Sequence, residues 1–252
     1  MNFLSQTIAA KPEPDWPALL AQPIAENNDP LVPLGLVNSP LRAYPAYFHQ
    51  GVPGSLSECY VRRSVLFRLY KAARLLPAGI ELVVLDGWRP LQVQQHLFDT
   101  LFAAMSAHYA SESEPELLNR IRHFVALPSS DPAAPSPHLT GGSVDVALCD
   151  GEGLLLDMGT EFDDISPWSY SAAFEAIEKP NAREAEVIEN RRLLHSVMIQ
   201  AGFTNLPSEW WHFDYGNQSW AWYSKSGEAV FSATELQPLR QRWLRQVALQ
   251  VQ

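Results

Sequence analysis

The sequence predicts an α+β fold of one domain, in which antiparallel strands pack with helices. Three observations predict this class. Hydrophobic residues make up 46% of the 252 positions, so the chain can bury a sizeable core without disulfides. Helical patterns come early in the chain, and antiparallel hairpin patterns follow with one helix between them. No linker between these patterns is long enough to force a second domain.

The first part of the chain favours an arm followed by a helix. Prolines interrupt residues 1–55 and hydrophobic periodicity is weak there, which predicts an extended arm that lies over the body. An apolar stripe then predicts a helix near residues 57–76, which Pro77 and Gly79 end. The opposite face of this helix is basic and is expected to be solvated; it consists of Arg62, Arg63, Lys71 and Arg74.

Strands, helices and loops alternate in the rest of the chain. The predicted strands cover residues 80–85, 143–149, 203–206, 210–215 and 218–223, and a turn at 151–153 leads into a short partner at 154–156. The predicted helices cover residues 90–108, 115–125, 181–202 and 233–249, and a proline-rich loop covers 126–137. Asn181 begins a capping-box pattern and Gly202 ends its helix, whereas Pro238 is expected to delay or kink the last helix.

Composition excludes several classes of function. The 18 basic and 28 acidic residues give a net charge of −10, so the basic footprint of a nucleic-acid binder is missing and an anionic membrane surface is disfavoured. Cys59 and Cys149 are too few for a disulfide framework or a four-cysteine zinc site. No stretch approaches the roughly 18 apolar residues of a membrane span. Because no signal segment is visible, we expect a cytoplasmic protein.

Two short segments carry the residues that could perform chemistry. In the strand at 143–149, Val144 and Val146 share an apolar face, so Asp145 projects from the other face and needs a partner there. His138 precedes this strand, and Glu209 and His212 flank two tryptophans further on. Each of these residues alone fits a structural role, such as a salt bridge or a core histidine.

Together the two segments supply a set of ligands suited to a catalytic metal. Two imidazoles and one carboxylate, from His138, His212 and Asp145, are a common set for Zn²⁺ with a fourth position open. Glu209 is close to His212 in sequence and is not needed as a ligand, so it could act as a general base.

Four motifs in this order resemble the zinc D-Ala-D-Ala dipeptidases of the vancomycin-resistance type. Ser136-x-His138-x-x-Gly141-x-Ser143-x-Asp145 matches the first family motif with serine in place of alanine, and Glu209-x-Trp211-His212 matches the second. Asp86-Gly-Trp-Arg89-Pro90 has tryptophan where the family has tyrosine, and residues 158–163 resemble a further family segment. The resemblance covers about residues 40–225, and the two substitutions put the size and polarity of the pocket in doubt.

The resemblance implies a fold and a role for each matched residue. The fold would be a central antiparallel sheet flanked by helices, like that of hedgehog signalling domains and D-Ala-D-Ala peptidases. It implies the zinc peptidase domain at residues 41–225; outside the resemblance, we expect a proline-rich arm at 1–40 and a helical extension at 226–252 packed on the same domain. One Zn²⁺ per chain would be held by His138, Asp145 and His212. Glu209 would be the general base and acid, and Arg89 would stabilise the oxyanion. Substrate contacts would come from Ser136, Asp163, Trp211 and Tyr44, with Tyr47 as an alternative to Tyr44.

The resemblance therefore implies zinc-dependent hydrolysis of D-Ala-D-Ala or a similar small D,D-dipeptide. Asp163 would accept the free ammonium of the dipeptide. Two alternatives remain open: a D,D-carboxypeptidase or L,D-endopeptidase on peptidoglycan peptides, and a zinc-binding module without turnover. The presence of both Glu209 and Arg89 argues against the second, because a binding module needs neither a base nor an oxyanion donor.

Overall fold

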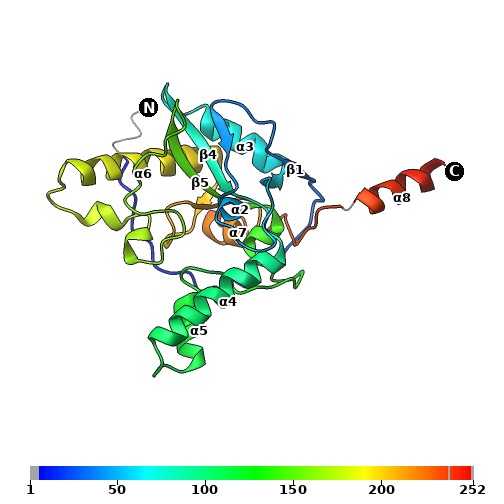
Figure 1. Cartoon of the computed structure of the whole chain (residues 1–252), viewed down its shortest axis with the longest axis horizontal. Coiled ribbons are helices and arrows are strands. Elements are labelled where there is room, and N and C mark those ends of the chain that lie inside the picture. Colours follow the sequence, from blue (N-terminus) through cyan, green and yellow to red (C-terminus); the bar gives the residue numbers. More distant parts are fainter. Residues whose placement is uncertain (1–5, 238, 251–252) are drawn as a thin grey trace.

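A five-stranded sheet forms the centre of the molecule (Figure 1). The computed structural model of the chain describes residues 6–237 and 239–250. The strands are β1 (Leu31–Pro33), β2 (Leu41–Ala43), β3 (Tyr60–Arg62), β4 (Ile80–Asp86), β5 (Ser143–Asp150), β6 (Thr204–Asn205) and β7 (His212–Asp214). The helices are α1 (Trp16–Leu20), α2 (Ala46–His49), α3 (Arg63–Ala73), α4 (Leu91–His108), α5 (Glu114–Ile121), α6 (Ala182–Ala201), α7 (Gln218–Ser224) and α8 (Leu239–Gln250), with short 3₁₀ turns η2 (Pro137–Thr140), η3 (Pro167–Ser169) and η4 (Ala173–Ala176).

The order of strands in the sheet is β2-β4-β5-β7-β6, and β1 pairs with β3 in a separate two-stranded sheet. The pairs β4–β5, β5–β7 and β6–β7 are antiparallel, which confirms the predicted α+β class. The pair β2–β4 is parallel, so the sheet departs from the expected antiparallel arrangement at its β2 edge.

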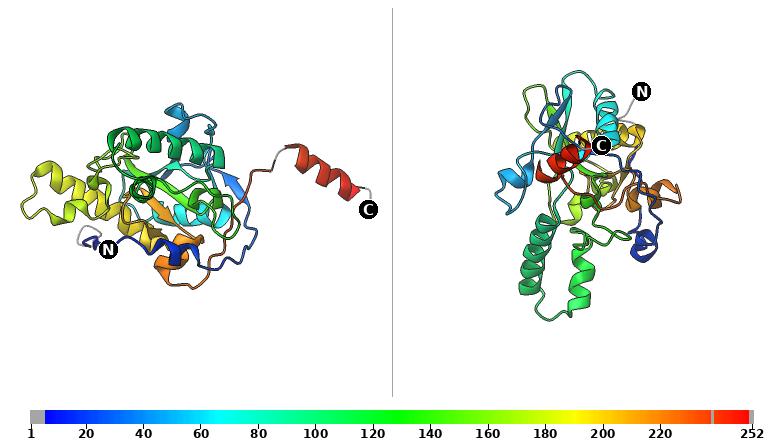
Figure 2. Two further views of the ribbon diagram at one scale, coloured as in Figure 1. Left: turned by 90° about the horizontal axis from the view of Figure 1, so that it is seen from below. Right: turned by 90° about the vertical axis from the view of Figure 1, so that its right-hand side faces the viewer.

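One face of the sheet packs on two helices. Helices α3 and α6 contact each other and lie against the strands (Figure 2). Val144, Val146 and Phe213 are buried in the main core on this side, where Phe213 meets His195 of α6. Because side chains alternate along a strand, Asp145 points to the opposite face, as the sequence predicted. That face carries the residues of the candidate site.

Helices α4 and α5 form a hairpin that projects from the body (Figures 1 and 2). The hairpin has a small hydrophobic core of its own, formed by Met105, Leu117 and Ile121. Both helices and the loop after them lie close to their predicted positions. The loop returns the chain to the sheet at η2.

The predictions for β4, β5 and α6 are confirmed to within a few residues. The side chain of Asn181 accepts a hydrogen bond from the Glu184 amide, and Glu184 accepts one from the Asn181 amide, so the predicted capping box is present. Gly202 has a φ of 100° and ends the helix in the left-handed conformation. The partner predicted at 154–156 is reduced to a bridge between Leu155 and Cys149.

The predicted start of the helix at 57–76 was wrong. Residues Tyr60–Arg62 form strand β3, and the helix begins at Arg63. Arg62 is 3% exposed rather than solvated, because its guanidinium pairs with Glu26 and donates to three backbone carbonyls. The sequence pattern could not show this partner, which lies 36 residues away.

The strand predicted at 218–223 was also wrong, because Gln218–Ser224 form helix α7. The alternation of Trp220 and Trp222 indicated a strand. The side chain of Asn217 accepts a hydrogen bond from the Trp220 amide, however, and this N-cap starts a helix.

The expected extended arm at residues 1–55 contains more structure than predicted. It contains α1 and α2, β1 pairs with β3, and β2 joins the central sheet. Residues between these elements run over the body, where the amides of Ala25 and Asn27 donate to carbonyls of residues 229 and 230.

Residues 226–252 do not all pack on the domain as expected. Ala229 and Phe231 are buried against it. Helix α8 instead extends away from the body (Figures 1 and 2), and Trp243 and Leu244 on it are exposed. Pro238, expected to delay or kink this helix, lies outside the described residues. None of the helices that the structure describes is long and apolar enough to cross a membrane.

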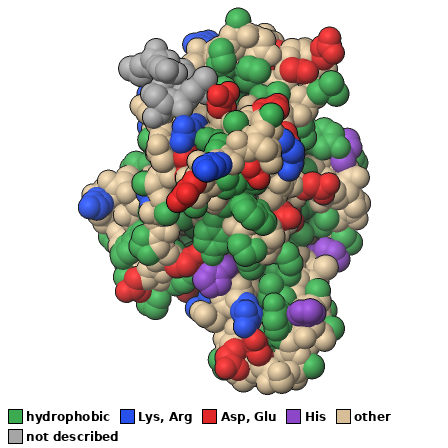
Figure 3. Space-filling model, turned by 90° about the vertical axis from the view of Figure 1, so that its left-hand side faces the viewer, with side chains coloured by type: hydrophobic (Ala, Val, Ile, Leu, Met, Phe, Trp, Pro, Cys, Tyr) green, Lys and Arg blue, Asp and Glu red, His purple; other side chains and the backbone are tan. Residues whose placement is uncertain are grey.

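One face of the molecule carries charges of both signs (Figure 3). On the face in Figure 3, lysine and arginine side chains are scattered among acidic and hydrophobic ones. The described residues on this face do not form the broad basic patch that a nucleic-acid backbone would require.

Candidate metal centre

The strand register places three polar residues in one row across the sheet. Asp145 of β5 is paired with Asp86 of β4 on one side and with His212 of β7 on the other. A register shift between Val84 and Asp86 precedes this row. Residues paired directly across antiparallel strands point to the same face, so the row presents two carboxylates and one imidazole side by side.

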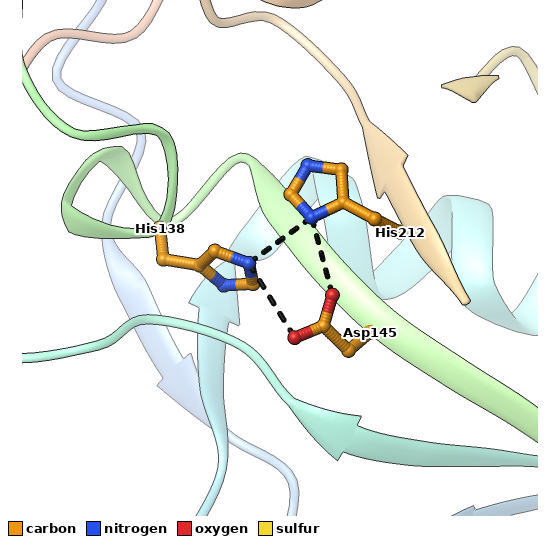
Figure 4. Close-up of side chains that lie close together, drawn as sticks. All are labelled: His138, Asp145 and His212. Atoms are coloured by element: carbon orange, nitrogen blue, oxygen red, sulfur yellow. Dashed lines mark hydrogen bonds and ion pairs between the residues drawn. The ribbon is translucent and has the colours of Figure 1, made fainter. Parts of the chain in front are cut away.

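His138 approaches this row from the 3₁₀ turn η2. The turn ends at Gly141, whose φ of 72° is the left-handed conformation that glycine adopts without strain. His138 Nδ1 lies 2.7 Å from the carbonyl oxygen of Gly87, so it donates a hydrogen bond there. This contact leaves His138 Nε2 free to face the row (Figure 4).

The three predicted ligand residues come together with separations that fit a metal ion. His138 Nε2 lies 3.2 Å from His212 Nδ1 and 3.5 Å from Asp145 Oδ2, and His212 Nδ1 lies 3.2 Å from Asp145 Oδ1 (Figure 4). Nitrogen or oxygen ligand atoms that each lie about 2.0–2.1 Å from a tetrahedral metal ion are roughly 3.3–3.4 Å from one another. All three residues are buried, and they form a candidate metal site.

The remaining nitrogen of His212 is held by a second carboxylate. His212 Nε2 lies 3.1 Å from Asp214 Oδ2. Asp214 Oδ1 in turn accepts hydrogen bonds from Ser143 Oγ at 2.7 Å and from Asn217 Nδ2 at 2.6 Å. Burial alone would lower the pKa of His212, but Asp214 and Asp145 outweigh it and raise this pKa. A carboxylate behind a ligating imidazole orients the ring toward the metal.

Glu209 and Arg89 line the same pocket as the ligand residues. Glu209 Oε2 lies 3.6 Å from His212 Nδ1, and burial raises the pKa of Glu209 to about 8. Arg89 is buried, and its guanidinium donates to Asp86, Gln94 and Asp145 at 2.8–3.2 Å. The pocket therefore contains an acid–base group and a fixed cation beside the candidate metal site.

Asp163 and Trp211 complete the wall of this pocket. Asp163 has a φ of 67°, a conformation that aspartate tolerates better than most residues, and burial raises its pKa to about 6. Trp211 is 2% exposed and meets the ring of Phe162 edge-on at 5.6 Å. The pocket wall thus contains an acidic group and a rigid aromatic side chain.

Comparison with known proteins places this geometry in a family. Residues 55–229 match the family model described as D-ala-D-ala dipeptidase. A D-alanyl-D-alanine dipeptidase of Synechocystis sp. is 35% identical over 219 residues, which are 81% of this chain and 88% of that protein. The chain belongs to the D-Ala-D-Ala dipeptidase family. This confirms the resemblance inferred from the motifs.

Other members and solved structures are more distant from the chain. The family member of Escherichia coli is 28% identical over 63% of this chain and 67% of that protein, and the one of Enterococcus faecium is 29% identical over 58% and 67%. A solved vancomycin-resistance D,D-dipeptidase in complex with a D-Ala-D-Ala phosphinate analogue is 19% identical, with a TM-score of 0.38 over 82% of this chain and 68% of that one.

Two of the substrate contacts implied by the family resemblance are not found in the pocket. Tyr44 is 49% exposed and stacks on His49, whereas Tyr47 is buried, lines the pocket and has its hydroxyl 3.4 Å from Arg89. The side chain of Ser136 contacts the backbone of residues 127 and 129 and lines a neighbouring cavity. The structure therefore places Tyr47, the second residue of α2, in the pocket instead of Tyr44.

The family motifs did not reveal the groups that support the ligand residues. Asp214, Asn217 and Gln94 were not identified from the sequence. A signal for Asp214 was available, because it lies two residues after His212 on one strand and must share its face. Gln94 lies one turn into α4, and its contact with Arg89 depends on the angle at which that helix leaves the sheet.

Proposed function

We propose that the chain is a zinc-dependent dipeptidase that hydrolyses D-Ala-D-Ala or a similar small D,D-dipeptide. The observation that carries this proposal is the arrangement of Glu209 and Arg89 in one pocket with the three ligand residues. Family membership supports the substrate class, since the curated relatives are D-alanyl-D-alanine dipeptidases.

His138, Asp145 and His212 would hold one Zn²⁺ per chain. Two imidazoles and a carboxylate with donors 3.2–3.5 Å apart suit this ion. Zinc supplies Lewis-acid polarisation of the peptide carbonyl and of the attacking water. The buried surroundings strengthen this electrostatic effect, because little bulk water is present to screen it.

The other side chains provide proton transfer and charge stabilisation. Glu209 would accept a proton from the attacking water and return it to the leaving amine as the C–N bond breaks. Arg89 would stabilise the negative charge that develops on the carbonyl oxygen, because its contacts with Asp86 and Gln94 fix it in place beforehand. In its ionised form, the carboxylate of Asp163 would bind the free ammonium of the dipeptide.

The position of Asp163 in the site pocket favours a dipeptide over longer peptides, because its carboxylate can bind a free ammonium. The part lined by the ligand residues has a cavity volume of about 50 Å³, and Asp163 borders it. A D,D-carboxypeptidase or L,D-endopeptidase would have to extend its substrate past Asp163. The cytoplasmic location expected from the sequence stays a prediction.

Release of D-alanine from free D-Ala-D-Ala by the zinc-loaded protein tests the proposal. We expect release to stop after chelation and to fall about 10²- to 10⁴-fold in Glu209→Ala, which removes the base. Glu178→Ala, at an exposed glutamate outside the pocket, is the control and should keep full activity. A protein that binds one zinc and releases no D-alanine would contradict the proposal. Activity on a pentapeptide ending in D-Ala-D-Ala, without activity on the dipeptide, would favour the carboxypeptidase alternative.

A further inference from the structure

Arg122 lines the pocket of the candidate site but belongs to none of the family motifs described above. It follows helix α5 directly and comes from the α4–α5 hairpin rather than from the sheet. The side chain borders the same pocket as Asp163, Glu209 and the ligand residues. The pocket therefore includes a second arginine in addition to Arg89.

The guanidinium of Arg122 has no acceptor in the structure. Among the described residues, it makes no hydrogen bond or ion pair, and its Nε is buried without a partner. A buried donor without an acceptor costs free energy. Arg89 differs, because its nitrogens already donate to Asp86, Gln94 and Asp145.

The charges around the pocket leave Arg122 available to an anion. Asp145 faces the two imidazoles, and Asp163 and Glu209 are the other carboxylates on the wall. None of these three carboxylates is paired with Arg122 in the described part of the chain. A free dipeptide is a zwitterion, and its ammonium and carboxylate lie at opposite ends. Asp163 suits the first end, and the second end needs a cation.

The space beside Arg122 fits this assignment. Arg122 also lines an adjoining cavity of about 310 Å³, which shares Trp16, Ala126, Pro137 and Ser219 with the site pocket. The site pocket has a cavity volume of about 50 Å³, and the adjoining cavity provides further room next to Arg122. Its lining is largely apolar, which suits a small D-amino acid side chain.

We infer that Arg122 binds the C-terminal carboxylate of the dipeptide, in the pocket where Asp163 faces its ammonium. This inference rests on the proposed function and adds the residue that recognises the carboxyl end. The planar guanidinium can donate two parallel hydrogen bonds to a carboxylate, and such charge-assisted pairs are among the stronger polar contacts. A charged group at each end would restrict the enzyme to substrates of two residues.

Two substrates that differ at the carboxyl end test this inference. D-Ala-D-Ala and D-Ala-D-alaninamide share the scissile bond and the ammonium, but the amide lacks the carboxylate. We expect Arg122→Ala to lower kcat/KM for D-Ala-D-Ala about 10- to 100-fold, mainly through KM, and to change kcat/KM for the amide less than about threefold. Arg122→Lys should recover part of the loss, because lysine keeps the positive charge but cannot donate two parallel hydrogen bonds to one carboxylate.

The control is Arg120→Ala, in the last turn of α5 just before Arg122. Arg120 is exposed and pairs with Glu112, outside the pocket, so both substrates should be cleaved as by the wild type. Equal losses on both substrates in Arg122→Ala, or no loss on either, would overturn the assignment of the carboxylate. Thermal unfolding and bound zinc are measured for each variant, and Arg122→Gln replaces Arg122→Ala if the latter does not fold. A wild-type protein that cleaves neither substrate would instead overturn the proposed function, and the inference with it.

Discussion

At the scale of single residues, the support behind His212 determines how well the site can hold a metal. Asp214 fixes the ring through Nε2, and Ser143 and Asn217 fix Asp214. Ser143 stands where the family motif has alanine, so its hydroxyl adds a hydrogen bond to this carboxylate. Ser143, which was expected to change the pocket, therefore supports the candidate ligand residue His212 through Asp214.

We predict that Asp214→Ala lowers zinc affinity about 10- to 100-fold, because His212 loses the group that orients its ring. Ser143→Ala should lower the affinity less, since Asn217 still donates to Asp214. Competition with a zinc chelator measures both effects. Asp99→Ala, on the exposed side of α4, is the control. Unchanged affinity in Asp214→Ala would show that the ring is oriented without this carboxylate.

A pH dependence follows from Asp163. Burial raises its pKa to about 6, from an ordinary value of about 3.8. The carboxylate is therefore charged above pH 6 and becomes neutral as the pH falls through 6, while the ammonium of the dipeptide stays charged. We predict that KM for D-Ala-D-Ala rises as the pH falls from 7 to 5. In Asp163→Asn, KM should be high and should not follow this titration. A wild-type KM that is constant from pH 7 to 5 would argue against the ammonium contact.

The convergence of His138, Asp145, Glu209 and His212 on one pocket could be predicted because their motifs are local and specific. His138 and Asp145 lie seven residues apart, Glu209 and His212 lie three apart, and strand alternation fixed the direction of Asp145. Tyr47 and Arg122 could not be selected in this way. Their positions depend on how a short helix and a projecting hairpin return to the sheet, and no spacing in the sequence encodes that.

At the scale of elements, long periodic segments were predicted well and short ones poorly. Helix α6 has 20 residues and signals at both ends, β4 is mostly apolar, and β5 alternates apolar and polar residues in its first half. Strands β1, β2 and β6 have two or three residues each, so pairing with neighbours rather than their own pattern makes them strands. The helix α7 was missed because its cap, Asn217, is a stronger determinant than its aromatic alternation.

Helix α6 supplies a prediction at this scale. Asn181→Ala removes the side chain that caps the Glu184 amide, which should lower the free energy of unfolding by about 1 kcal/mol. Urea denaturation followed by circular dichroism measures the change. Glu189→Ala, on the exposed face of the same helix, should have little effect. Equal stability of Asn181→Ala and the wild type would mean that packing alone fixes the start of α6.

At the scale of the whole molecule, Arg62 connects segments that are far apart in sequence. Its guanidinium pairs with Glu26 of the arm and donates to the carbonyls of Asp29, Thr140 and Ser232. Thr140 ends the turn that carries His138. One buried cation thus joins the arm, the site turn and the segment after α7.

We predict that Arg62→Met lowers the free energy of unfolding by about 1–3 kcal/mol, because it leaves backbone carbonyls without their donor, whereas water can still reach the carboxylate of Glu26. Chemical denaturation measures the loss. Arg63→Met is the matched control, since Arg63 is exposed at the adjacent position. Similar losses for both variants would show that the contacts of Arg62 do not govern stability.

The pairing of Asp145 with His212 also dictates when the metal site can form during synthesis. His138 and Asp145 are made early, but the third ligand residue lies on β7, 67 residues after Asp145. A growing chain that ends before β7 contains only two of the three candidate ligand residues. Under the proposed function, zinc uptake would follow the pairing of β7 with β5, after the ribosome has completed most of the chain.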